Sequence, residues 1–287
     1  MKVSIICPVY NGECFLEGLH DSLMKQRNVQ ISSIEYVMTE GEDKTEEVLK
    51  KLDCKYIKIK KSEFSHSITR EEASFRADGE ILVFITQDIK IEDDLWLYYL
   101  ITPIIEGKCV ASFSRQVCID KTIEKYVREK NYPLEARIKS IDDIDELGIK
   151  TFYFSDASSA IRKDIFVELK GYDNKNLLTN EDMYIAYKII MAGYKIRYSP
   201  ESWVIHSHNL TMKEQYKRYY STGIFLGENS YMLNYNAKKA GMGLLEYVVK
   251  RSLKEKNYKA FVNIIPNFGA RYLGDFFGKR KGKKNLK

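Results

Sequence analysis

The sequence lacks a long apolar run. A helix that spans a membrane needs about 20 consecutive, mostly apolar residues, and no stretch of the 287 residues approaches that length. Met1 and Lys2 lead directly into a short apolar segment, so we also expect no signal peptide. The sequence thus predicts neither a spanning helix nor a leader.

Cysteine is scarce and shows no pairing pattern. The chain has five cysteines, an odd number, and none of them are spaced as CxxC. Disulfide frameworks and most cysteine-based metal sites use even sets or close pairs. We therefore expect reduced thiols and a cytoplasmic protein.

Most of the chain also lacks an excess of either charge. Lys and Arg total 46 against 40 Asp and Glu, and six of the basic residues fall within residues 279–287. The rest of the chain is therefore neutral, which argues against a nucleic-acid partner. A basic terminus beside aromatic residues suits an anionic membrane surface; the alternative is a solvated, disordered end.

Short apolar runs alternate with helical patterns through the first half of the chain. This alternation predicts βαβ units, and hence an α/β protein with a mostly parallel central sheet flanked by helices. The expected strands are residues 3–7, 34–38, 56–59 and 81–85. In the second half we expect strands at 110–113, 152–154 and 203–205, with a turn at Pro200. Residues 120–150 are charged and read as an insertion or lid.

The apolar run Ile81–Ile85 ends on Thr86, Gln87 and Asp88. Ligands of parallel sheets bind beyond the carboxyl ends of the strands, so this triplet lies where a ligand is expected. The alternative is that Asp88 caps the next helix. The turn after the first strand, Pro8-Val9-Tyr10-Asn11-Gly12, is not GxGxxG, so a dinucleotide-binding fold lacks its fingerprint.

Seven motifs follow one another along the chain. They are Pro8-Val9-Tyr10-Asn11-Gly12, Phe64-Ser65-His66 with Thr69-Arg70, Phe84-Ile85-Thr86-Gln87-Asp88 with Trp96-Leu97, Ser155-Asp156 with Ala160-Ile161-Arg162, Glu181-Asp182, Ala192-Gly193-Tyr194, and His206-Ser207-His208. In this order they resemble the motifs of an inverting glycosyltransferase of family 2 with a GT-A fold, most closely its rhamnosyltransferase-like branch. The resemblance covers roughly residues 1–220. We accordingly divide the chain into a GT-A domain (1–220), a C-terminal helical extension (221–278) and a basic tail (279–287).

The resemblance implies a divalent metal, Mg²⁺ or Mn²⁺. Family members usually carry an Asp-x-Asp triplet after the fourth strand, and the triplet here keeps only its second acid, Asp88. His206, which lies 24 residues after Asp182, is the expected second ligand and His208 the alternate; the opposing interpretation is that the two side chains face opposite ways and only one of them functions. Such an ion stabilises the departing diphosphate.

The resemblance also implies a base and a set of donor contacts. Inversion needs a base opposite the leaving group; Asp182 matches that residue, and Glu181 is the alternative. Gln215-x-x-Arg218-Tyr219 resembles the QxxRW motif of processive relatives. The residues expected to bind the nucleotide sugar are Pro8, Tyr10, Asn11, Glu40, His66, Arg70, Thr86, Gln87, Asp88 and Arg218.

The resemblance further implies a reaction that moves a sugar from a nucleotide-diphosphate donor to a lipid-linked or polysaccharide acceptor during surface polysaccharide synthesis. By resemblance alone, dTDP-rhamnose is the favoured donor and a UDP-hexose the alternative. A sugar nucleotidyltransferase would carry a Gly-rich, basic loop after the first strand, which is missing. A non-catalytic binding module would explain the lost first Asp but not the joint presence of Asp88, Asp182 and His206.

The C-terminal region combines an apolar helical pattern with the basic cluster. Its apolar residues recur every three or four positions, and Pro266 is expected to divide the pattern into two short helices. These residues are Phe261, Ile264, Ile265, Phe268, Tyr272, Leu273, Phe276 and Phe277. The combination predicts peripheral attachment to the inner face of the cell membrane.

Overall fold

The computed structural model describes residues 1–235 and 238–286, with no side-chain description for 238–242. The chain forms two compact units. The first contains residues 1–115, 134–141 and 152–206, and the second contains residues 116–133, 142–151 and the chain from residue 207 on.

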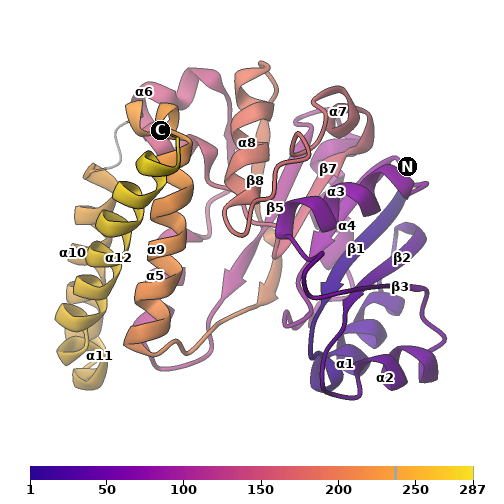
Figure 1. Cartoon of the computed structure of the whole chain (residues 1–287), viewed down its shortest axis with the longest axis horizontal. Coiled ribbons are helices and arrows are strands. Elements are labelled where there is room, and N and C mark those ends of the chain that lie inside the picture. Colours follow the sequence, from indigo (N-terminus) through magenta and orange to yellow (C-terminus); the bar gives the residue numbers. More distant parts are fainter. Residues whose placement is uncertain (236–237, 287) are drawn as a thin grey trace. The chain divides into compact units, whose positions relative to one another are not determined.

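The first unit is built on a sheet with the strand order β3-β2-β1-β4-β7-β5-β8-β6 (Figure 1). Strands β1 to β4 pair in parallel, whereas β7 is antiparallel to β4 and β5, and β6 is antiparallel to β8. The sheet is therefore mixed, and the expectation of a mostly parallel sheet holds only for its first four strands. The bounds are β1 (Lys2–Val9), β2 (Gln30–Thr39), β3 (Tyr56–Ile59), β4 (Ile81–Ile85), β5 (Ala111–Val117), β6 (Arg137–Lys139), β7 (Ser158–Arg162) and β8 (Ile196–Ile205).

Strand β4 lies inside the sheet and spans the five residues predicted for it. All five are fully buried, as expected of a continuous apolar run between two neighbouring strands. Its parallel register with β1 pairs Ile5 with Val83. The carboxyl end of β4 thus opens at the same sheet edge as that of β1.

Helices connect the strands of the first unit. They are α1 (Glu13–Met24), α2 (Thr45–Lys51), α3 (His66–Arg76), α4 (Trp96–Ile105), α7 (Lys163–Glu168) and α8 (Glu181–Met191). Trp96 is fully buried, and its indole N–H lies 3.1 Å from the hydroxyls of both Ser114 and Ser158. Trp96 is therefore a core residue and anchors α4 to the sheet.

Two local predictions were wrong. Residues 152–154 are not a strand: Phe152 ends the 3₁₀ helix η2 (Gly148–Phe152), and the strand is β7 instead. The aromatic residues are core anchors, since the Phe154 ring lies 5.3 Å from that of Phe113. Pro200 makes no turn, because β8 runs through it; proline keeps an extended φ and loses only one ladder hydrogen bond.

The charged segment expected to be an insertion or lid is divided between the units. It holds α5 (Ile123–Asn131), η1 (Ile141–Asp143), α6 (Ile144–Leu147) and the beginning of η2, whereas β6 joins the sheet by pairing with β8. Helix α5 contributes to a small core with α10 (Lys238–Lys254), α11 (Tyr258–Val262) and α12 (Ile264–Asn285). This core is formed by Ile123, Tyr126, Val127, Val248, Ala260 and Ile264.

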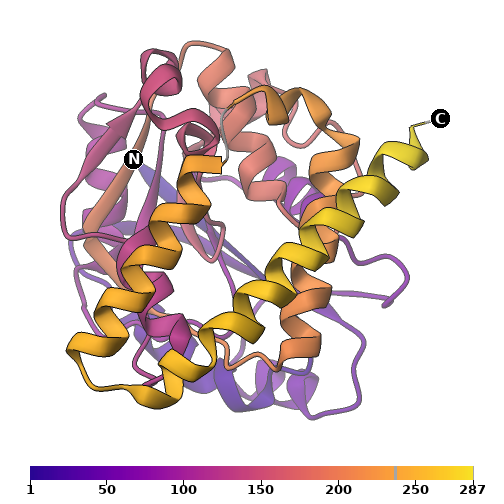
Figure 2. The same ribbon diagram turned by 90° about the vertical axis from the view of Figure 1, so that its left-hand side faces the viewer.

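The second unit is largely helical. After α9 (Met212–Glu228) come η3 (Ser230–Asn234), α10 (Lys238–Lys254), α11 (Tyr258–Val262) and α12 (Ile264–Asn285). Figure 2 shows the chain turning through α11 at the foot of α10 and running back as α12. Thr211 caps α9 in a capping box with Glu214. The proposed domain boundary at residue 220 falls within α9.

The predicted break at Pro266 was wrong. The break between α11 and α12 is at Asn263, and Pro266 lies in the first turn of α12, where the missing N–H costs no helical hydrogen bond. Helix α12 continues to Asn285 and so includes most of the basic cluster. Among the described residues, no helix is both long and apolar enough to cross a membrane.

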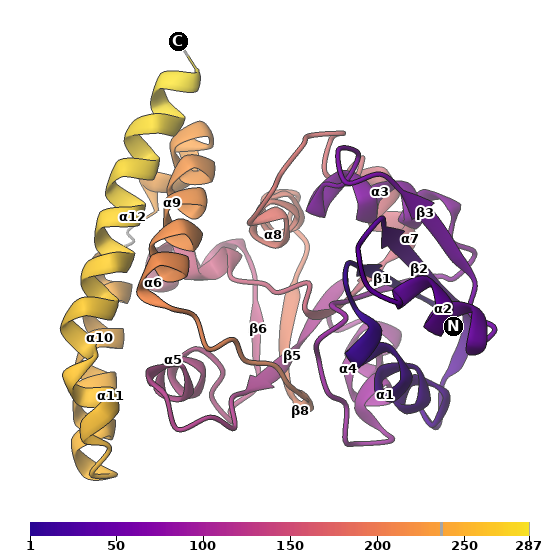
Figure 3. The ribbon, with the colours of Figure 1, turned by 60° about the horizontal axis from the view of Figure 1, so that its bottom comes forward.

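Helices α9 and α12 lie side by side (Figures 1 and 3). They touch through glycines: Cα atoms of Gly223 and Gly278 line the contact, and a Cβ added to Gly278 would lie 2.2 Å from the Tyr220 carbonyl oxygen. Gly227 and Gly282 make the same kind of contact one turn further along. Only glycine permits this approach of the two backbones.

Candidate active site

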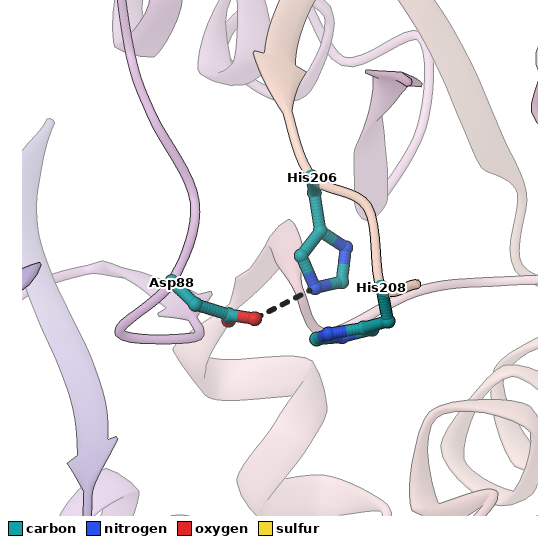
Figure 4. A group of neighbouring side chains, drawn as sticks. All are labelled: Asp88, His206 and His208. Carbon is teal, nitrogen blue, oxygen red and sulfur yellow. Dashed lines mark ion pairs between the residues drawn. The ribbon is translucent and has the colours of Figure 1, made fainter. Parts of the chain in front are cut away.

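Asp88 and His206 follow two different strands and meet at the sheet edge. Asp88 comes three residues after β4, and His206 directly follows β8. Lys90 and Ile205 exchange both backbone hydrogen bonds, each 2.9 Å long, and thereby tie the two strand ends together. The Asp88 Oδ2 atom lies 3.5 Å from Nε2 of His206, which is 7% exposed (Figure 4).

His208 completes the group drawn in Figure 4. One oxygen of Asp88 and one ring nitrogen each of His206 and His208 lie within 4.8 Å of one another. The expectation that the two histidines face apart was wrong: both side chains approach Asp88, and residues two positions apart lie on the same face of a strand in any case. One carboxylate and two imidazoles are a donor set that fits a divalent transition ion.

The other members of the triplet have separate roles. Gln87 Oε1 accepts a hydrogen bond from the backbone N–H of Tyr10 (2.8 Å), and its Nε2 donates to the Tyr10 carbonyl (2.9 Å). Gln87 thus clamps the end of β4 to the end of β1. Among the described residues, the buried hydroxyl of Thr86 has no hydrogen-bond partner.

The loops after β1 and β2 are joined by Asn11. Its Oδ1 accepts a hydrogen bond from the N–H of Glu42 (3.1 Å), and its φ of 46° lies in the left-handed region that asparagine tolerates. Tyr10 is exposed, and its hydroxyl accepts a hydrogen bond from Lys61 (3.0 Å). Glu40 is exposed and Pro8 half-buried in β1. The four predicted donor-binding residues therefore lie in neighbouring segments.

A buried arginine lies in the second turn of α3. Arg70 is 1% exposed and lies 3.3 Å from Oε1 of Glu181, itself 7% exposed. Its Nη1 donates to the His66 carbonyl (3.0 Å) one turn earlier, while its buried Nε lacks a partner within the described chain. Burial and the neighbouring Arg70 lower the pKa of His66 to about 4, so this imidazole is neutral at pH 7.

A second buried carboxylate, Asp156, was named in a motif but given no function. It accepts hydrogen bonds from the hydroxyls of Tyr172 (2.9 Å) and Ser159 (2.7 Å). Burial raises its pKa from 3.8 to about 6, although nearby Arg70 acts in the opposite direction. Glu71 in turn accepts from the backbone N–H of Tyr172, a contact between residues 101 positions apart that sequence spacing does not reveal.

Glu181 and Asp182 begin α8 in different environments. Asn180, at a φ of 60°, turns the chain into the helix. Glu181 faces Arg70, whereas Asp182 is half-buried and accepts a hydrogen bond from the N–H of Met183 (2.7 Å). Burial, followed by the charges of Glu181 and Asp156, raises the pKa of Asp182 well above its usual value. Asp182 is thus a carboxylate with increased proton affinity.

Arg218 belongs to the second unit, where it is exposed on α9. The other two residues of its motif make contacts there: Gln215 is buried, and the Tyr219 hydroxyl accepts a hydrogen bond from Arg271 (2.9 Å). Arg218 is consequently not among the side chains gathered in the first unit.

The fold is shared with a protein of known structure. The crystallised mannosyltransferase PcManGT from Pyrobaculum calidifontis, in complex with GDP-Man and Mn²⁺, is similar with a TM-score of 0.63 over 99% of this chain and 88% of that one. At 12% sequence identity, this likeness establishes the fold alone. It confirms the predicted α/β, GT-A architecture of nucleotide-sugar-dependent glycosyltransferases.

Sequence comparison gives the family. The model of glycosyl transferase family 2 matches residues 4–170. The chain is 32% identical over 231 residues to the O-antigen chain rhamnosyltransferase RfbN of Salmonella typhimurium, covering 78% of this chain and 72% of that protein. It is 34% identical over 226 residues to WbaN, the O-antigen chain rhamnosyltransferase of Salmonella anatum, covering 77% and 71%. The chain belongs to glycosyltransferase family 2, and the protein is a glycosyltransferase.

Proposed function

We propose that the protein transfers rhamnose, with inversion, from dTDP-rhamnose to a lipid-linked or polysaccharide acceptor in surface polysaccharide synthesis. The observation that carries this proposal is the grouping, in the first unit, of a buried Arg–Glu pair, the adjacent Asp182 and the Asp88–His206 pair at the sheet edge. The names of the two Salmonella relatives support rhamnose, and a UDP-hexose remains the alternative donor.

Asp182 would act as the base. The acceptor hydroxyl attacks the anomeric carbon while the bond from that carbon to the diphosphate breaks, and the electron pair leaves with the diphosphate oxygen. The hydroxyl proton passes to the Asp182 carboxylate, whose raised pKa favours accepting it. Glu181 is the weaker candidate, because its oxygen already lies 3.3 Å from the Arg70 guanidinium.

Asp88, His206 and His208 would hold Mn²⁺ or Mg²⁺. When bound, such an ion neutralises charge on the leaving diphosphate. Two imidazoles beside one carboxylate favour Mn²⁺ over Mg²⁺, which prefers an all-oxygen shell. Calorimetry of nucleotide-diphosphate binding tests this assignment without measuring turnover. Asp88→Ala and His206→Ala should each remove the gain in affinity on adding Mn²⁺, and an undiminished gain in both variants contradicts the site.

The segments around Tyr10, Asn11 and Glu40 would contact the base and ribose, and Arg70 would supply positive charge near the diphosphate. The buried Nε of Arg70, which has no acceptor among the described residues, supports this assignment. A hydrolysis screen of nucleotide sugars with Mn²⁺ tests the donor. We expect dTDP-rhamnose to be hydrolysed fastest; preferential hydrolysis of a UDP-hexose would replace the donor but keep the reaction.

The second unit would attach the enzyme to the cytoplasmic face of an anionic membrane. The side of α12 that faces α9 carries small or polar residues, whereas Ile265, Tyr272 and Leu273 are 84%, 67% and 47% exposed. Basic residues occupy the last turns of the same helix. Exposed apolar side chains followed by cations match the interface of an anionic leaflet.

A further inference from the structure

A small pocket lies within the second unit, where three segments meet. It is lined by residues that precede α5, by the segment that leads into α9, and by the junction of α11 with α12. Its volume is about 200 Å³. None of its lining residues belongs to the candidate active site of the first unit.

The lining of this pocket is positively charged. Lys121 and Lys259 contribute to it, and no Asp or Glu does. Neither ammonium group has an ion-pair partner among the described residues, in contrast to the nearby Lys125, whose Nζ lies 2.6 Å from Glu255. The pocket therefore favours an anion.

The pocket also contains a hydrogen-bond donor without an acceptor. Asn267 is 3% exposed, and its Oδ1 accepts a hydrogen bond from Nε of Arg271 (2.7 Å). This bond fixes the amide orientation and leaves Nδ2 with no acceptor in the described part of the chain. Asn267 lies in the first turn of α12, whose amino end carries partial positive charge.

Exposed apolar side chains stand on the same two helices. Tyr258 and Val262 of α11 and Ile265 of α12 are 64%, 72% and 84% exposed. A free phosphate would gain nothing from them, whereas an amphiphile would place its chain along them and its charged group in the pocket.

We propose that this pocket binds the phosphate group of a lipid-linked acceptor. The inference rests on the proposed function, which supplies such an acceptor. Lys121 and Lys259 neutralise the phosphate as point charges, the Asn267 amide donates to one of its oxygens, and the lipid chain lies against the exposed residues of α11 and α12. The second unit thus selects the acceptor's lipid end.

The test compares two double variants that remove the same charge. Lys121→Gln with Lys259→Gln alters the pocket, and Lys254→Gln with Lys256→Gln removes two exposed lysines that do not line it. The probe is a phosphatidylcholine vesicle that contains a small fraction of polyprenyl phosphate. We expect the pocket variant to lose affinity about tenfold and the control to stay within about twofold. Equal binding by the pocket variant and the unmodified protein would overturn the proposal.

Asn267→Asp is a second test of the pocket, because aspartate keeps a hydrogen-bond acceptor for Arg271 but repels phosphate. It should bind polyprenyl-phosphate vesicles more weakly while melting at an unchanged temperature. Phosphatidylglycerol vesicles distinguish recognition of polyprenyl phosphate from binding to any anionic lipid headgroup. If both lysine variants lose the same affinity on every anionic vesicle, only general surface charge is acting, and the pocket proposal falls.

Hydrolysis of the nucleotide sugar separates failure of the pocket from failure of the proposed function. The unmodified protein and all pocket variants should hydrolyse the donor equally. A protein that hydrolyses no nucleotide sugar contradicts the proposed function, whereas normal hydrolysis with unimpaired vesicle binding in the variants overturns the pocket alone.

Discussion

The two units differ in what they bury and expose around their proposed functional regions. In the first, Arg70, Glu181 and Asp156 are among the least exposed residues, beneath a sheet edge whose strands are apolar. In the second, α12 buries glycines against α9 and exposes aromatic residues such as Tyr272. Buried charge is costly unless it is paired or used, and exposed apolar surface is costly unless it is covered. Each unit thus departs from ordinary packing at the place where we propose a function.

The largest effect should come from the base. Asp182→Asn keeps the shape of the side chain but cannot accept a proton, so turnover should fall by about 10²–10⁴-fold while donor affinity is retained. Single-turnover transfer and calorimetry of the donor measure the two quantities. Because the pKa of Asp182 is raised, the rate of the unmodified enzyme should decline on the acid side at a higher pH than for an ordinary aspartate.

Glu181→Gln is the matched variant at the neighbouring position. It removes the charge that faces Arg70 and should weaken donor binding or stability more than turnover. If Glu181→Gln abolishes transfer and Asp182→Asn transfers sugar normally, the assignment of the base is reversed.

The second effect concerns the buried charge of Asp156. Its folded-state pKa of about 6 lies above the unfolded value of 3.8, so the protonated form is favoured by folding and ionisation opposes it. The stabilisation that the protonated Asp156 provides is fully present below the unfolded pKa and is lost as the pH rises through about 6. The free energy of unfolding of Asp156→Asn, relative to that of the unmodified protein, should therefore increase from pH 4 to pH 8, by at most roughly 3 kcal/mol.

Urea unfolding at several pH values measures this trend. Asp164→Asn is the control, because Asp164 is largely exposed and its pKa is lowered, first by its hydrogen bond with Arg162. That variant should lose a little stability above the normal pKa of an aspartate and none below the lowered one. A pH-independent difference for Asp156→Asn would show that its ionisation does not oppose folding.

These side chains also show how far the sequence could predict the structure. Strands β3 and β4 were placed correctly because each is a short segment with several apolar residues between polar or turn residues, and the triplet ending in Asp88 located the sheet edge. The Asp156–Tyr172–Glu71 contacts were missed because they join residues distant in the chain. The strand expected at 152–154 failed because tertiary aromatic packing overrides local β-propensity. For α12, the apolar spacing was visible, but only the glycine contacts decide which face is buried.

The third effect tests the glycine contact of α9 with α12. Gly278→Ala places a Cβ where the Tyr220 carbonyl oxygen lies 2.2 Å away, so the helices must separate, at a cost of about 1–3 kcal/mol. Gly269→Ala on the same helix meets nothing within 4 Å and should stabilise by about 0.5–1 kcal/mol. Thermal unfolding distinguishes them. Equal melting temperatures for the two variants would contradict the close backbone contact.

The smallest effect concerns the exposed face of α12. Deleting the residues after Gly278 would also remove the contact of Gly282 with α9, so substitution is the better test of membrane binding. Tyr272→Ser with Leu273→Ser should weaken binding to anionic vesicles by about tenfold, since each side chain would bury apolar area in the interface. The control, Leu134→Ser with Leu178→Ser, removes apolar side chains that are 71% and 66% exposed in the first unit and should leave binding unchanged.

Vesicle co-sedimentation at low and high salt measures both pairs. Added salt should weaken the contribution of the terminal basic residues but not that of the apolar face. If the α12 pair sediments like the control pair under both conditions, this face does not contact the membrane.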